Sequence, residues 1–218
     1  RTEILTLECV DGHSVASAEV AALPLATRDE LGKVMLQLFF AEVFDLGLVQ
    51  TDPNFGNYLI SDAGTELTLL DFGSVFELDQ IVRAALYDAI VGGLIKDEAR
   101  LEKALVQLGC LTSDAGDSAK STFKAFIGNL LEPLLPPEAL PSEFLNAEGQ
   151  YCWGRSGLIN RTGQQVARSL TNREFAIPSG DFAMVARKLT GVFTFIAVLN
   201  AEFNGRDIVA PYLAKVTV

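Results

Sequence analysis

The spacing of apolar residues changes along this chain, from the alternation that is typical of strands to the three-to-four-residue spacing that is typical of helices. The run Ile4–Val10 alternates and is rich in β-branched residues, which is typical of a strand, and Asp11-Gly12 ends it. Two more short apolar runs, 57–60 and 66–70, flank a turn that contains Gly64 and predict a β-hairpin. Beyond residue 78 the apolar spacing is three to four residues, which predicts helices.

A long apolar stretch precedes the predicted hairpin. Thr27 and Glu30 have the spacing of a capping box with Thr27 as N-cap, and the helix is predicted to continue through Leu31 to Leu46 and to end at Gly47. This helix is apolar around most of its circumference, so we expect it to be central and buried. A loop is predicted from residue 48 to 56. Later helices are expected at 78–95, 97–108, 118–135, 157–170, 180–200 and 207–215, with a proline-rich connection at 133–141.

This order of elements predicts one domain over residues 1–218. Its fold class is α+β and mostly helical, with one strand at residues 1–12, a small β-hairpin within 48–73 and a helical region over 78–218.

Charge and cysteine content exclude several classes of function. Seventeen basic and 28 acidic residues give a net charge of −11, so we expect no nucleic acid partner, although magnesium would allow a nucleotide to bind. Cys9, Cys110 and Cys152 lie far apart, which excludes a zinc ribbon or a dithiol motif and is typical of free thiols inside a cell. His13 follows a turn-like glycine and is interpreted as a surface residue, not as a catalytic base.

Three oxygen-bearing side chains are predicted to converge beside the hairpin. Asp52 and Asn57 are five residues apart ahead of its first strand, and Asp71 begins an Asp-Phe-Gly sequence at the end of the second. Phosphoryl transfer needs such a set: a carboxylate that orients the acceptor, and an amide oxygen and a second carboxylate that hold magnesium. The alternative is that Asp52-Pro53-Asn54 is only a turn and Asp71 only a cap.

The segments Gln50–Asn57 and Leu69–Gly73 carry a family resemblance. Read as Q-T-D-P-N-F-G-N and L-L-D-F-G, they resemble the UbiB or AarF-domain (activity-of-bc1-complex) family of atypical kinases, which support ubiquinone and other isoprenoid-lipid metabolism. Similarity continues at Ile4–Gly12, Arg173–Pro178 and Arg187–Gly191, so it covers nearly the whole chain.

The resemblance implies a kinase-like C-terminal lobe with ATP and Mg2+ as cofactors. Asp52 would be the catalytic aspartate, Asn57 and Asp71 the metal ligands, and the backbone at Glu8 and Val10 would face adenine. The N-terminal lobe, with its phosphate-binding lysine, would precede Arg1 and is absent from this sequence. Lys33, Lys96 and Lys103 fall on predicted helices and cannot replace that lysine. We therefore expect the chain alone to be inactive and to need the missing lobe.

The acceptor and the partners are less constrained. The segment Ser74–Asp79 leads directly into a helix without Ala-Pro-Glu, which argues against protein substrates. Arg187 and Lys188 are interpreted as a solvated helix face, with an acidic headgroup site as the alternative. The apolar segment Phe182–Phe203 predicts a central packed helix; alternatively one edge of it, with Leu130, Leu134 and Leu135, lines a groove for an isoprenoid lipid or contacts a membrane surface.

Three classes of function therefore stay open. They are a UbiB-like kinase or ATPase, a small-molecule phosphotransferase resembling aminoglycoside or choline kinases, and a catalytically inactive lipid-binding module. No stretch is long and apolar enough to span a bilayer. We expect an intracellular chain, soluble or peripherally membrane-associated, in the bacterial cytoplasm or mitochondrial matrix.

Overall fold

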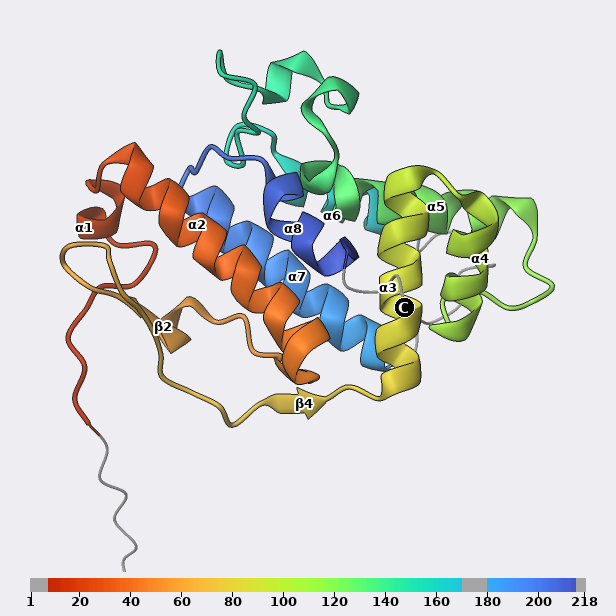
Figure 1. Ribbon diagram of the computed structural model, residues 1–218, viewed down its shortest axis with the longest axis horizontal. Helices are drawn as coiled ribbons and strands as arrows, with labels where there is room; N and C mark the ends of the chain where they lie inside the picture. Colours follow the sequence, from red (N-terminus) through yellow and green to blue (C-terminus); the bar gives the residue numbers. More distant parts are fainter. Residues whose placement is uncertain (1–7, 170–179, 215–218) are drawn as a thin grey trace, which may run out of the picture.

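Two long helices, α2 (Leu25–Phe40) and α7 (Gly180–Val198), lie side by side in the computed structural model (Figure 1). The structure describes residues 8–169 and 180–214. Its helices are α1 Ala18–Ala21, α2 Leu25–Phe40, α3 Gln80–Ile95, α4 Glu98–Gln107, α5 Asp117–Leu131, α6 Leu158–Ser169, α7 Gly180–Val198 and α8 Gly205–Ala214. Its strands are β1 Leu48–Gln50, β2 Tyr58–Ile60, β3 Leu67–Leu69 and β4 Val75–Glu77. The predicted α+β, mostly helical class is confirmed.

Helix α2 begins one residue after Pro24, so the prediction that Thr27 is its N-cap is wrong. The Thr27 and Arg28 amides already donate to the Pro24 carbonyl at 3.0 and 3.1 Å, which places Thr27 inside the first turn. The helix continues as a π-helical turn, Ala41–Leu46, and ends at Gly47 as predicted. Gly47 has φ of 69°, a conformation that glycine adopts without a steric penalty.

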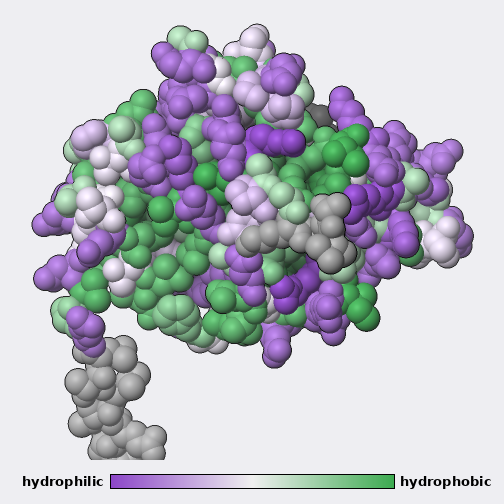
Figure 2. Space-filling model, viewed as in Figure 1, coloured by the Kyte–Doolittle hydropathy of each residue, from purple (hydrophilic) through white to green (hydrophobic). Residues whose placement is uncertain are grey.

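Only one face of α2 is buried, which corrects the expectation of burial all round. Leu31, Met35 and Phe39 are buried, and the helix packs against α7 and α8. Leu25 and Val34 are exposed, and Figure 2 shows apolar surface over this outward side of α2.

The four strands form two nested antiparallel ladders. The inner ladder pairs β2 with β3, in the register Tyr58↔Leu69 and Ile60↔Leu67, and confirms the predicted hairpin. The outer ladder pairs β1 with β4, so that Gln50 lies opposite Val75. The sequence predicted no strands at 48–50 or 75–77. Three-residue strands are too short for alternation to be visible, and only their pairing defines them.

The predicted strand at residues 1–12 is only partly within the described residues. Positions 8–12 form no strand, and the nearest pairing is an isolated bridge between His13 and Ile60, with hydrogen bonds of 2.8 and 2.9 Å. His13 is partly exposed, and its ring lies 2.8 Å from the Asp62 carboxylate. The expectation of a surface histidine fits this position.

The later helices follow the sequence closely because side chains cap them. The Asp79 carboxylate accepts the Ile81 amide at 2.7 Å and starts α3, and Asp97 does the same for α4 through Arg100. Gly109 has φ of 68°, as expected for a residue that ends a helix. Helix α5 ends at Leu131, and its predicted last turn is instead the 3-10 turn Glu132–Leu134, followed by the 3-10 turns Pro137–Ala139 and Ser142–Phe144.

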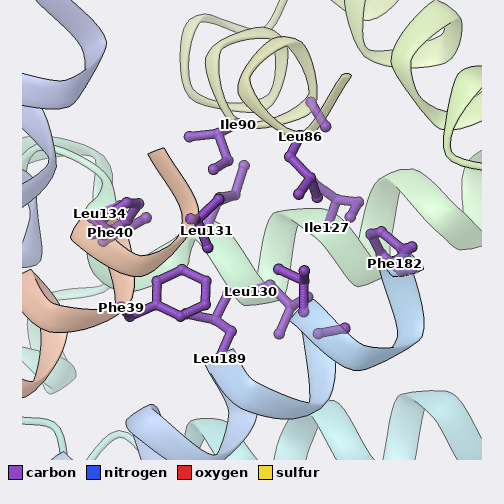
Figure 3. A pocket seen from close by; sticks show the side chains of 14 residues that line it. Phe39, Phe40, Leu86, Ile90, Ile127, Leu130, Leu131, Leu134, Phe182 and Leu189 are labelled. Carbon is purple, nitrogen blue, oxygen red and sulfur yellow. The ribbon is translucent and has the colours of Figure 1, made fainter. Parts of the chain in front are cut away.

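Helix α7 is the central helix of the lobe, as predicted. The apolar α7 side chains that suggested a groove, from Phe182 to Ile196, are buried, and so are Leu130 and Leu134. Leu135 is partly buried, and Met184 and Val198 of the same helix are exposed. A cavity of about 50 Å³ does remain between α2, α3, α5 and α7. Figure 3 shows that only apolar side chains point into it, among them Phe39, Leu131 and Leu189. Without a polar partner it cannot hold a phosphate. None of the described helices is both long and apolar enough to cross a membrane.

The cysteines differ in exposure, which predicts their reactivity. Burial raises the pKa of Cys110 to about 12, and burial also raises the pKa of Cys152, whereas Cys9 is exposed. Only the thiolate is nucleophilic. We expect Ellman's reagent at pH 8 to modify Cys9 within minutes, and the other two thiols only after denaturation. Rapid modification of two or three thiols in the folded protein would contradict this burial.

Candidate active site

The two segments that hold the candidate site residues lie between the nested ladders. Residues 51–57 connect β1 to β2, and residues 70–74 connect β3 to β4. The Thr51 amide donates to the Ser74 carbonyl at 2.8 Å at one end of this region. The Leu70 amide donates to the Asn57 carbonyl at 2.9 Å at the other end. The ladders therefore hold the two segments against each other at both ends.

Asp52 and Asn57 are in direct contact. The Asn57 Nδ2 donates to the Asp52 carboxylate at 2.8 Å, which leaves the Asn57 Oδ1 as the acceptor atom of that amide. Asn54 shapes the loop, because its side chain accepts the Gly56 amide at 2.9 Å and its carbonyl accepts the Asn57 amide at 3.0 Å. The turn that Asn54 stabilises therefore lies within the same short loop as the Asp52–Asn57 hydrogen bond.

Asp71 is exposed and sits directly after the end of the inner ladder. Its Oδ1 accepts the Gly73 amide at 2.7 Å, so the carboxylate is oriented by its own loop. Together Asp52, Asn57 and Asp71 offer two carboxylates and one amide oxygen, which are hard donors that suit magnesium. Among the described residues, this site included, no group of three or more histidine, cysteine, aspartate or glutamate side chains could hold a metal.

Glu8 and Val10 lie outside the two segments between the ladders. Both are exposed, in the extended segment that leads to the His13–Ile60 bridge. Within residues 8–169 and 180–214, no backbone hydrogen bond of Glu8 or Val10 to another segment is seen, and their contact with adenine stays a prediction.

Lys188 is buried, which corrects its interpretation as part of a solvated helix face. Only 1% of its surface is exposed, and its ammonium lies 3.1 Å from Glu42 Oε2. It also donates to Tyr58 Oη at 3.1 Å and to Gln50 Oε1 at 3.4 Å. The neighbouring residue Arg187 does reach the surface, 3.9 Å from the Asp52 carboxylate.

Glu42 lies in the π-helical turn at the end of α2 and is buried. Burial raises the pKa of Glu42 above its ordinary value, and the Lys188 ammonium opposes that rise. Sequence reasoning missed this pair. Glu42 and Lys188 each interrupt an apolar helical run, and a charge within an apolar run is the signal that would have pointed to a buried partner.

Gly191 lets α7 approach the loop that carries Asp52. A Cβ at position 191 would lie 2.1 Å from Pro53 Cβ, so any larger residue would overlap the loop. An open cleft of about 520 Å³ adjoins this contact, between the 53–55 loop and the Arg187–Thr194 face of α7. Helix α7 therefore contacts this loop at several points.

Comparison with known proteins decides the family. Residues 1–105 match the ABC1 atypical kinase-like domain. The chain is 26% identical over 204 residues to a probable serine/threonine-protein kinase, abkA, of Dictyostelium discoideum, and 23% identical over 205 residues to the mitochondrial atypical kinase COQ8 of Schizosaccharomyces pombe. These matches cover 92% and 94% of the chain.

The chain belongs to the ABC1 atypical kinase-like family.

This family member spans about a third of the length of those relatives, 35% and 32% respectively. Its fold is also found in a solved structure, that of the complex of Rv3197 with erythromycin from Mycobacterium tuberculosis. The TM-score is 0.65 at 19% identity, and the match covers 93% of this chain and 47% of the other. That similarity confirms the kinase-like fold. The matched part of Rv3197 is likewise about half of a longer chain.

Proposed function

We propose that this chain is the helical lobe of an ATP-dependent atypical kinase or ATPase that acts in ubiquinone or other isoprenoid-lipid metabolism. In this proposal Asp52 orients or deprotonates the phosphoryl acceptor, while Asn57 and Asp71 hold magnesium on the nucleotide phosphates. Glu8 and Val10 lie along the adenine. The single observation that carries the proposal is the Asp52–Asn57 contact of 2.8 Å beside the Asp71 turn.

Family membership supports the use of ATP and a metal ion, and the isoprenoid-lipid role follows the sequence resemblance. Bound magnesium would neutralise phosphate charge in the transition state. The chain's own part is to hold Asn57 and Asp71 at fixed positions between two ladders. Relatives named as mitochondrial proteins support an intracellular compartment.

Manganese titration followed by nuclear magnetic resonance tests the metal assignment. Because paramagnetic Mn2+ replaces magnesium at oxygen sites and broadens nearby signals, we expect the Asn57 and Gly73 amide signals to disappear first, and Mg2+ to restore them. The carboxylates of Glu98, which is exposed, and Glu102, which is partly exposed, give the internal comparison, since Lys124 pairs with both, at 2.8 and 2.7 Å. Equal broadening at all acidic surfaces would exclude a specific site.

A further inference from the structure

A buried hydrogen-bond network connects the segments that carry Asp52, Asn57 and Asp71. Its centre is the Lys188 ammonium on α7, with Glu42, Gln50 and Tyr58 as its three acceptors. An ammonium has three donors, so each has a partner. All four side chains are buried.

The partners of Lys188 are neighbours of the candidate site residues in sequence. Gln50 is two positions before Asp52, and Tyr58 follows Asn57 directly. Gln50 also contacts Asp71, because its Nε2 donates to the Asp71 carbonyl at 3.4 Å. One amide therefore links the Lys188 ammonium to the backbone of the Asp71 turn.

Stability alone explains this arrangement poorly. Moving a lysine and a glutamate out of water carries a large desolvation penalty, and apolar side chains of similar size often replace such pairs without loss of stability. Apolar side chains cannot reproduce the directional hydrogen bonds of this network. The Lys188 ammonium and the Gln50 amide fix β1, β2 and the Asp71 turn at set distances from one another.

We propose that Lys188 is a positioning residue that, through Gln50 and Tyr58, fixes the Asp52–Asn57 loop relative to the Asp71 turn. It does not touch the metal or the phosphates. This inference rests on the proposed function for its catalytic meaning, but its structural content can be tested without any activity.

The test compares matched variants of the full-length protein. Tyr58→Phe removes one acceptor of Lys188, and Gln50→Met removes the link to Asp71. Tyr151→Phe is the control: its hydroxyl is also buried and donates to a charged side chain, Glu132 Oε1 at 2.6 Å, in a network on other elements. Lys188→Met is the strongest change, and the two milder variants keep the test valid if it does not fold.

The first measurement is hydrogen exchange of peptides that contain the Thr51, Leu70 and Gly73 amides. Because a lost bond to a charged group weakens the local structure, we expect exchange about tenfold faster in Tyr58→Phe and Gln50→Met, and unchanged in Tyr151→Phe. The second is the Mg2+ concentration that gives half-maximal ATP turnover, expected to rise about tenfold in the same two variants.

The outcomes separate the two proposals. If the parent protein has no ATP turnover, the proposed function is wrong, but the hydrogen-exchange rates of the variants still test the positioning role of Lys188. Exchange in Tyr58→Phe and Gln50→Met equal to that in Tyr151→Phe overturns the inference. So does faster exchange with an unchanged Mg2+ requirement, because the network would then stabilise the loop without positioning the site.

Discussion

Asp71→Asn is expected to remove magnesium-dependent ATP turnover from the full-length protein, with a loss on the order of a hundredfold or more. The substitution takes away the negative charge that would hold the metal. It keeps an oxygen that can accept the Gly73 amide, which Asp71 Oδ1 now accepts at 2.7 Å. Because Asp71 is exposed, the free energy of unfolding should change by no more than about 0.5 kcal/mol.

Asp114→Asn is the matched control for that experiment. Asp114 is also exposed in a turn, and hydrogen bonds from Thr112 and from backbone hold the pKa of its carboxyl below the ordinary value. It lies between α4 and α5, away from the nested ladders. Turnover should match the parent in this variant. Parental turnover in Asp71→Asn, measured with ATP and Mg2+ at saturation and below it, would show that Asp71 is not a metal ligand.

Gly191→Ala is expected to destabilise the protein by about 1–3 kcal/mol, although alanine is the better helix former. The added methyl would lie 2.1 Å from Pro53 Cβ, so the loop before Asn57 or helix α7 must move. For a chain of this size that corresponds to a melting temperature lower by several degrees, at ~2–4 °C per kcal/mol. The affinity for Mn2+ should fall as well, because the same loop leads to Asn57, which is proposed to hold the metal.

Gly128→Ala makes the same chemical change in the interior of another helix. Nothing lies within 4 Å of a Cβ at position 128, so this variant should gain about 0.5–1 kcal/mol from helix propensity. Chemical denaturation measures the free energy of unfolding of both variants. A decrease in Gly191→Ala together with an increase in Gly128→Ala would establish that the Gly191–Pro53 contact is tight. A stabilised Gly191→Ala variant with unchanged Mn2+ affinity would refute it.

The local features of this protein could be predicted from sequence because short-range chemistry produces them. The Gly47 helix end, the hairpin around Gly64 and the start of a helix near residue 97 each depend on a few adjacent residues. The Asp52–Asn57 contact is also of short range, since the two residues are five positions apart in a turn-forming sequence that brings their side chains together.

Tertiary structure alone decided which distant residues meet. Lys188 and Glu42 are 146 positions apart, and the sequence alone placed Lys188 on a solvated helix face. Periodicity shows which face of a helix is apolar, but not which element covers it, so the pairing of Lys188 with Glu42 and the Gly191–Pro53 contact could not be predicted. The β1–β4 ladder was missed for the same reason, because strands of three residues are defined by their partner. Sequence by itself therefore determined the family, the mostly helical fold and the candidate site residues, whereas packing between segments far apart determined how these residues are held in place.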